Sequence, residues 1–144
     1  MVPDRQKIAA GAQQPEKFDV IIVGAGISGI GSATLLRKHC PDLSFAILEA
    51  LEGHGGTWLI HKYPGTRSDS DLFTFGYGFK PWTGQPIASR DQILDYLGEA
   101  IADAGLGPSI RYGHSVKSAD WSSETARWQL TVERKGAGDV VQME

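Results

Sequence analysis

Cysteine is almost absent from this chain of 144 residues, in which Cys40 is the single example. One cysteine excludes a disulfide within the chain and cannot complete a cysteine-based zinc site, and it fits a reducing compartment, so we expect a cytoplasmic location. The four histidines show no metal-ligand spacing, and we expect no metal site. We expect Cys40, just before Pro41, to be a small buried apolar residue and not a reactive thiol.

Long apolar runs and an excess of positive charge are missing as well. No run approaches the roughly 20 residues that span a bilayer, and the net charge of −3 provides no basic surface for nucleic acid or an anionic membrane. Residues 1–17 lack the apolar core of a secretion signal. We expect them to form a disordered leader before one domain over residues 18–144.

A glycine-rich turn follows the first apolar run of the chain. Phe18–Val23 predicts a buried strand, residues 24–29 (Gly-Ala-Gly-Ile-Ser-Gly) have the pattern GxGxxG, and Ile30–His39 predicts a helix. In this context the first glycine permits a tight turn, the second leaves room for a pyrophosphate, and the third lets helix and strand pack closely. The free N–H groups at the start of the helix suit phosphate oxygens.

One acidic residue completes this pattern. Ser44–Leu48 predicts a second parallel strand, and Glu49 follows it, twenty positions after Gly29. A carboxylate at this place can accept hydrogen bonds from both hydroxyls of an adenosine ribose. The alternatives are an ordinary strand-to-helix turn and a surface carboxylate, but glycines and acid together favour dinucleotide binding.

The rest of the chain predicts an α/β fold. A helix is expected from Ser89, whose capping-box partner is Gln92, to Gly105. Beyond it the apolar period changes to two, which predicts a strand through 110–116 and then an antiparallel β-meander, with Trp121 and Trp128 packed across strands. We therefore expect a Rossmann-like domain, in which a parallel sheet with helices is joined to the meander.

Between residues 51 and 86 the periodicity disappears, and such long irregular segments are usually functional. Gly55 and Gly56 would let the backbone approach a ligand, and Thr57 and Trp58 add a hydroxyl group and a flat apolar face. The stretch 63–71 then places Arg67, Asp69 and Asp71 beside a Pro-Gly turn. The alternative for these three charges is a solvated surface loop.

Together these motifs resemble the N-terminal part of class B flavoprotein monooxygenases, which are the Baeyer–Villiger monooxygenases and their flavin-containing monooxygenase relatives. The resemblance covers nearly all of residues 18–132. The sequences of residues 67–71, 79–84 and 118–121 are most similar to the subgroup of ethionamide-activating monooxygenases.

The resemblance implies an FAD site and, in the complete enzyme, NADPH. The residues that it assigns to the FAD pyrophosphate and ribose are Gly24, Gly26, Ser28, Gly29 and Glu49, and those along the phosphate and ribityl side are Gly56, Thr57 and Trp58. It places Arg67 to Asp69 near the flavin ring and the nicotinamide, and Asp69 matches a carboxylate that orients an active-site arginine. The backbone of Val116 matches a position that meets the adenine.

Two features depart from the family pattern. Leu51 stands where relatives usually carry a basic residue beside the adenosine, and Glu144 ends the chain within the meander. Relatives continue into a last strand of the FAD domain, a second GxGxxG domain for NADPH, a further fingerprint motif and the catalytic arginine. We therefore expect a domain truncated before its last strand, with an exposed apolar sheet edge.

The expected function is the FAD-binding portion of an NADPH-dependent flavin monooxygenase, which uses O₂ to oxygenate small organic substrates at a carbonyl or a heteroatom. The 144-residue chain alone is expected to be inactive. The main alternative is a non-catalytic dinucleotide-binding remnant or excised domain. A third possibility is another flavoenzyme with two dinucleotide domains, such as an amine oxidase or a disulfide reductase.

Overall fold

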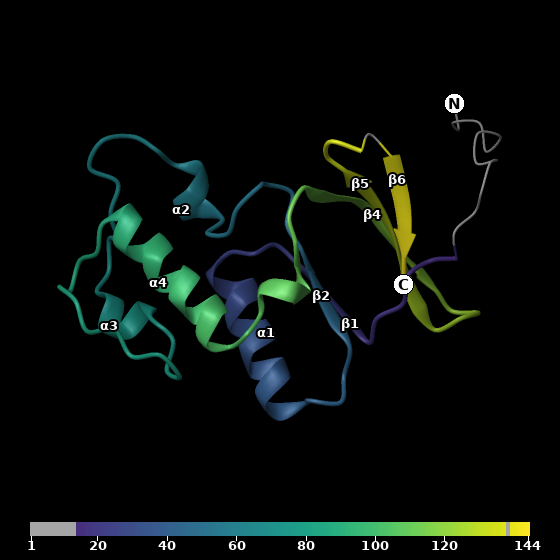
Figure 1. The fold of residues 1–144 in the computed structure, drawn as a ribbon, viewed down its shortest axis with the longest axis horizontal. Coiled ribbons are helices and arrows are strands. Elements are labelled where there is room, and N and C mark those ends of the chain that lie inside the picture. Colours follow the sequence, from purple (N-terminus) through teal and green to yellow (C-terminus); the bar gives the residue numbers. More distant parts are fainter. Residues whose placement is uncertain (1–13, 138) are drawn as a thin grey trace.

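The computed structural model describes residues 14–137 and 139–144 and shows three layers (Figure 1). Helices lie on one side of a parallel sheet, and an antiparallel sheet lies on the other side. The elements, in chain order, are β1 (Val20–Val23), α1 (Ile27–His39), β2 (Phe45–Leu48), α2 (Thr57–Ile60), α3 (Leu72–Phe75), α4 (Arg90–Asp103), the 3-10 turn η1 (Gly107–Ser109), β3 (Ile110–Arg111), β4 (His114–Ser122), β5 (Arg127–Arg134) and β6 (Asp139–Met143).

The parallel sheet confirms the expected βαβ unit. Its order is β1-β2-β3, and the register pairs Val20 with Phe45 and Val23 with Leu48. Helix α1 is the crossover between β1 and β2, and β3 pairs with β2 through Ile47 and Ile110. The antiparallel sheet has the order β4-β5-β6, as expected for a meander.

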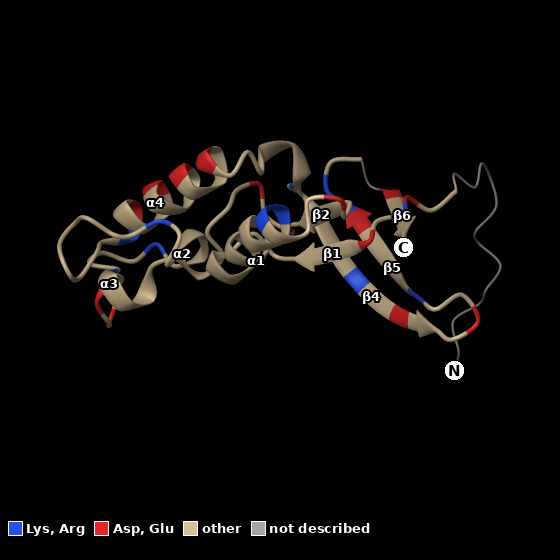
Figure 2. Ribbon diagram, turned by 90° about the horizontal axis from the view of Figure 1, so that it is seen from below, with Lys and Arg blue, Asp and Glu red and all other residues tan. Residues whose placement is uncertain are grey.

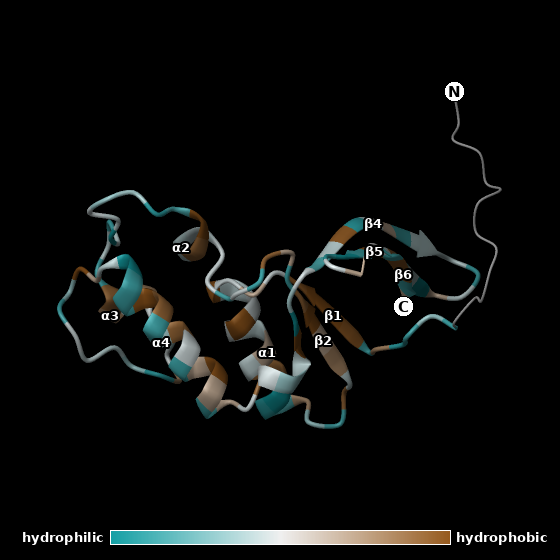
Figure 3. Cartoon of the chain, turned by 45° about the horizontal axis from the view of Figure 1, so that its top comes forward, coloured by the Kyte–Doolittle hydropathy of each residue, from teal (hydrophilic) through white to brown (hydrophobic). Residues whose placement is uncertain are grey.

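Both faces of β2 are covered, which explains why this strand is apolar throughout (Figure 3). On one face Ile47 is fully buried in a core with Ile30 of α1 and Leu97 of α4. On the other face Leu48 is buried against Leu130 and other residues of the antiparallel sheet. Alternate residues of β2 therefore belong to two separate cores. The expectation that the first strand is buried is wrong, because no residue of β1 is buried and Val23 is 64% exposed.

Helix α4 begins at the predicted capping box. The Ser89 hydroxyl accepts the Gln92 N–H, and the Gln92 side chain accepts the Ser89 N–H at 2.9 Å. Ile93 and Leu97 are fully buried on its inner face. Its outer face carries a row of acidic residues, red in Figure 2, which are Asp91, Asp95, Glu99 and Asp103.

The predicted strand through 110–116 is in fact two strands in different sheets. β3 ends at Arg111, and Gly113, with φ of +65°, turns the chain into β4. The sequence pattern hides this break because the apolar period of two continues from β3 into the start of β4. His114 is the first residue of β4, and its Nδ1 lies 2.7 Å from the carbonyl oxygen of Tyr112.

Three other expectations need correction or completion. Helix α1 begins at Ile27, earlier than predicted, because the helix incorporates the last part of the glycine motif. Cys40 is exposed and not buried, since it lies just past the last helical turn. Of the expected leader, residues 1–13 lie outside the described residues.

The described end of that expected leader contacts the meander. Glu16 forms a parallel bridge with Met143, and its carbonyl oxygen accepts the N–H of Glu144 at 2.9 Å. Arg111 donates hydrogen bonds to the Glu16 carboxylate, which lowers the pKa of that carboxyl group. The chain therefore pairs with β6 before Phe18 is reached.

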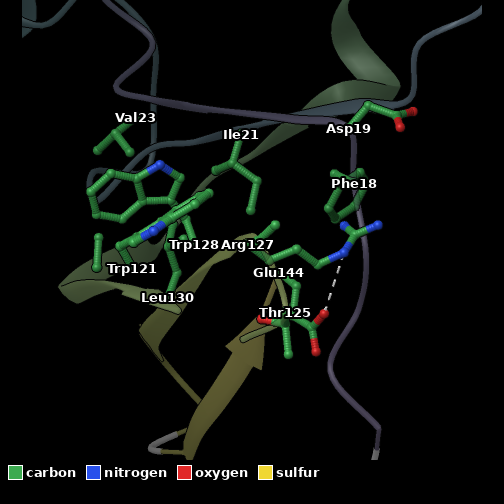
Figure 4. Close-up of a pocket in the computed structure, with 12 residues that line it drawn as sticks. Phe18, Asp19, Ile21, Val23, Trp121, Thr125, Arg127, Trp128, Leu130 and Glu144 are labelled. Atoms are coloured by element: carbon green, nitrogen blue, oxygen red, sulfur yellow. Dashed lines mark ion pairs between the residues drawn. The ribbon is translucent and has the colours of Figure 1, made fainter. Parts of the chain in front are cut away.

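One edge of the parallel sheet is open. Among the described residues, β1 pairs with β2 only. A hollow of about 720 Å³ lies beside it, with Ile21 and Val23 on one side and Trp121, Trp128 and Leu130 on the other (Figure 4). The two tryptophan rings are packed edge to face across β4 and β5, 5.6 Å apart, as expected.

The open apolar edge predicts self-association, because an unpaired apolar strand is a template for another chain. Val23→Lys should lower aggregation on heating, measured by light scattering, while the free energy of unfolding changes by no more than about 0.5 kcal/mol. Val140→Lys is the control, since Val140 is exposed to a similar extent (58% against 64%) on β6, which pairs with the segment at Glu16. Equal aggregation of the two variants and the wild type would contradict this prediction.

Candidate functional site

Two glycines of the GxGxxG motif are required by the fold itself. Gly24 has φ of +97°, which other residues rarely adopt, and its N–H donates to the carbonyl of Leu48 at 2.7 Å. A Cβ atom on Gly29 would lie 1.9 Å from the carbonyl oxygen of Gly24. Helix α1 therefore packs against the end of β1 only because both residues are glycines.

Gly26 differs from them, because the fold does not require a glycine there. Its φ is −85°, and a Cβ atom on it would make an ordinary contact of 3.7 Å with Cα of Gly56. The protein leaves this space next to the start of α1 free of side chains. A glycine that the fold does not need is explained by a ligand that passes over it.

The N-terminus of α1 is suited to an anion. No side chain caps it, and no acidic residue lies in its first turn. The first N–H groups of a helix have no partner within the helix and form its positive end. Ser28, in the first turn, is exposed there.

Glu49 lies beside this turn and is only 6% exposed. One carboxylate oxygen accepts the N–H of Ala25 at 2.8 Å, and the other accepts the N–H of Leu51 at 2.8 Å. The acid was predicted from the sequence, but its bond to the glycine turn was not. Since each carboxylate oxygen can accept more than one hydrogen bond, Glu49 keeps acceptor capacity for a ligand.

The environment of Glu49 also includes Tyr112 and His54. Burial, and then the negative charge of Glu49, raise the pKa of the Tyr112 hydroxyl. That hydroxyl lies 3.5 Å from Nδ1 of His54, whose Nε2 lies 3.3 Å from the carbonyl oxygen of Leu94. Because a carbonyl only accepts, Nε2 carries the proton in this contact. His54 thus links the loop after β2 to helix α4.

The second glycine pair lies against the first turn. The Gly55 N–H donates to the carbonyl of Ala25 at 2.8 Å, and both Gly55 and Gly56 have positive φ. A Cβ atom on Gly56 would lie 3.2 Å from Cα of Gly26. The structure therefore brings together two glycine turns that are about thirty residues apart in the sequence.

Helix α2 follows directly and contains the next two predicted residues. Thr57 is exposed at its start. Trp58 is half-buried and packs edge to face against Phe75, with ring centroids 6.2 Å apart. Trp58 is thus a packing residue as well as a candidate for contact with a bound ligand.

The charged segment lies elsewhere, at the N-terminal end of α4. Arg67 forms an isolated antiparallel bridge with Ser89, and both Arg67 and Asp69 are exposed. No ion pair involves either of them within the described part of the chain. Asp71 has a structural role instead, because its carboxylate accepts the Thr74 N–H at 2.9 Å and caps α3.

Val116 is the last predicted residue of the site. It lies on β4 opposite Val132, and its side chain packs in the core between the two sheets. The register shifts between Val116 and Ser118, which is a β-bulge at Lys117. Its side chain is partly buried by this packing, and the bulge lies next to its backbone.

Tyr77, which no motif in the sequence indicated, ties the irregular segment to α1. Its hydroxyl donates to the carbonyl oxygen of Ile27 at 2.5 Å, and burial raises its pKa. A Cβ atom on Gly31 would lie 2.9 Å from the Tyr77 ring, so Gly31 makes the room. The Tyr96 hydroxyl in turn accepts the Tyr77 N–H at 2.7 Å. In the sequence, the feature that could have indicated this contact is Gly31, since a glycine inside a helix often makes room for a packed side chain.

No group of three or more His, Cys, Asp or Glu residues that could hold a metal ion is found among residues 14–137 and 139–144. In the same part of the chain, none of the helices has both the length and the apolar character needed to cross a membrane.

Comparison with known proteins identifies relatives of this site. A family model described as an NAD(P)-binding Rossmann-like domain matches residues 22–97, which is more than half of the chain. The match includes both glycine turns, Glu49 and the segment around Arg67. The parallel sheet with its helices and the antiparallel sheet agree with this description.

Curated relatives confirm the expected resemblance. The FAD-containing monooxygenase EthA of Mycolicibacterium smegmatis is 52% identical over 122 residues, which cover 84% of this chain and 25% of that protein. The probable FAD-binding monooxygenase AlmA of an Acinetobacter species is 47% identical over 119 residues, which cover 82% and 24%. The chain thus spans about a quarter of the length of these relatives.

Solved structures show the same similarity. An oxidized steroid monooxygenase bound to NADP has a TM-score of 0.77 and 31% identity, over 88% of this chain and 25% of that chain. A closed crystal structure of cyclohexanone monooxygenase has a TM-score of 0.76 and 25% identity, over 90% and 25%.

The two hydrogen bonds of Glu49 predict that it stabilises the protein without any ligand. Glu49→Gln should lower the free energy of unfolding by about 1.5–3 kcal/mol, because an amide NH₂ replaces one acceptor of a backbone N–H. Urea unfolding of the flavin-free chain would measure this. The exposed Glu52→Gln, which loses only a 3.7 Å ion pair to Lys135, should change stability by no more than about 0.5 kcal/mol. Equal stabilities of the two variants would show that the Glu49 bonds contribute nothing.

Proposed function

The chain belongs to the family of NAD(P)-binding Rossmann-like domains, and from this we propose that it is the FAD-binding part of an NADPH-dependent flavin monooxygenase. The observation that carries the proposal is Gly26, a glycine that neither backbone conformation nor packing explains. The named relatives are FAD-containing and FAD-binding monooxygenases, which supports FAD as the dinucleotide.

The residues present fit an FAD pyrophosphate. The uncapped start of α1 offers N–H groups to the phosphates, with Ser28 exposed beside them. Gly26 and Gly56 face each other without side chains, so that backbone from both turns can approach the same ligand. Thr57 begins α2 immediately after this contact and can add its hydroxyl group.

The adenosine end fits a ribose without a phosphate. Glu49 is held in place by the N–H groups of Ala25 and Leu51, and it presents a negative charge that would repel a 2′-phosphate. Leu51 provides no cation to offset that charge. The uncompensated charge of Glu49 favours FAD over NADPH at the GxGxxG turn. The adenine of that FAD would lie against the backbone near Val116.

When bound, FAD would supply the redox chemistry, which is hydride transfer from NADPH and the use of O₂ to oxygenate a small organic substrate. This chain's residues bind and orient the flavin. We propose that Arg67 and Asp69, both exposed, face the flavin ring and nicotinamide side, where Asp69 would orient an active-site arginine of the complete enzyme. Cytoplasmic location is proposed from the cysteine content.

A second candidate is a dinucleotide-binding module without catalytic activity of its own. The observation that favours it is that the two glycine turns and Glu49 account for dinucleotide binding alone. Both candidates require FAD binding, and they differ in turnover.

FAD binding is tested at Gly26. Gly26→Ala should keep wild-type stability, because its Cβ meets no protein atom closer than 3.7 Å, but should weaken FAD binding on the order of tenfold or more. Gly26→Val should abolish retention. Flavin absorbance after gel filtration and titration with FAD measure both effects. Gly78→Ala, where a Cβ atom has open space, is the control. Wild-type affinity in Gly26→Ala would contradict the proposal.

Turnover separates the two candidates. The 144 residues contain one GxGxxG motif, which FAD uses, so the purified chain with FAD should show no substrate-dependent NADPH consumption above that of free FAD. A ketone and a thioether serve as substrates, with product analysis beside the absorbance of NADPH. Product formation coupled to NADPH consumption would refute the expectation that this chain is inactive alone.

A further inference from the structure

The segment that carries Arg67 and Asp69 is bound to the start of helix α4 by backbone hydrogen bonds between residues 66–68 and 88–90, a pairing called the clasp below. The Ser68 N–H donates to the carbonyl of Ala88 at 2.9 Å, and the Arg90 N–H donates to the carbonyl of Thr66 at 3.0 Å. This short ladder, residues 66–68 against 88–90, runs directly into the capping box of α4. The charged segment is therefore tied to the capped N-terminal end of α4.

Burial alternates along this segment. Thr66 and Ser68 are buried, whereas Arg67 and Asp69 are exposed. In extended backbone, residues two apart project to the same side and lie roughly 6.5 Å apart. The clasp thus presents a cation and a carboxylate together on the outer side.

Ser68 contributes a bond that no apolar residue could make. Its side chain is buried, with 4% exposure, and its hydroxyl accepts the N–H of Ala88 at 3.1 Å. Ala88 is fully buried. Without the hydroxyl, a buried N–H group would lose its acceptor, which is costly enough to open a ladder this short.

We propose that Ser68 is a positioning residue, whose buried hydroxyl closes the clasp and so holds Arg67 and Asp69 in place against bound flavin. This inference rests on the proposed function. Ser68 itself touches neither the flavin nor a reacting atom; it acts through the two charged neighbours.

The test compares Ser68→Ala with a pair of equal shape, Ser68→Thr and Ser68→Val, which differ only in the hydroxyl group. The Ala88 amide should exchange with solvent roughly tenfold faster in the Ala and Val variants, as measured by NMR on the flavin-free chain. With FAD added, their visible circular dichroism should change, while the dissociation constant of FAD rises less than about threefold, because the glycine turns are untouched. Ser68→Thr should behave as wild type.

Ser70→Ala is the matched control, since Ser70 is an exposed serine of the same segment, and it should leave both signals unchanged. If Ser68→Ala fails to fold, the comparison of Ser68→Thr with Ser68→Val still tests whether the hydroxyl group is required. Wild-type circular dichroism in Ser68→Val, or an unchanged Ala88 exchange rate, would overturn the inference. Failure of the wild-type chain to bind FAD would instead overturn the proposed function, and the inference with it.

Discussion

The buried carboxylate of Glu49 is the contact on which the rest of the site depends. Its two oxygens bind the N–H groups of Ala25, in the first glycine turn, and of Leu51, in the loop after β2. The backbone N–H of Glu49 donates to the carbonyl oxygen of Arg111, and the carbonyl oxygen of Glu49 accepts the N–H of His114. One residue therefore joins the glycine turn, the loop after β2, the end of β3 and the start of β4.

The position of Glu49, directly after β2, follows from the layered fold. Because β2 is covered by helices on one face and by the antiparallel sheet on the other, its carboxyl end is the place where all three layers meet (Figure 1). Ligands of open α/β sheets bind at the carboxyl ends of the strands. The turn at Gly113 matters for the same reason, because it sends the chain from one sheet to the other beside Glu49.

The irregular segment between residues 51 and 86 is held in place rather than loosely attached. Gly55 binds the first glycine turn, Tyr77 binds the first turn of α1, and Ser68 binds the start of α4. Two of these anchors end in the glycine motif, at Ala25 and Ile27, and the third ends at Ala88, just before α4. Irregular backbone can present side chains reproducibly only when its polar groups are satisfied in this way, which is the physical content of a preorganised site.

The sequence by itself determined the features that depend on local spacing. These are the GxGxxG turn with its acid, the capping box of α4 and the change of period that marks the meander, since each reflects neighbours within a few residues or one βαβ unit. Only the tertiary structure decided which side chains are buried and what they bind: Glu49 on Ala25, Asp71 as a helix cap beside an exposed Asp69, the break between β3 and β4, and the exposure of Cys40. The bond from Glu49 to Ala25 joins segments far apart in the chain, which no local pattern encodes. The Asp71 cap is local, since it binds the N–H of Thr74 three residues on, but the sequence pattern did not separate it from the exposed Asp69.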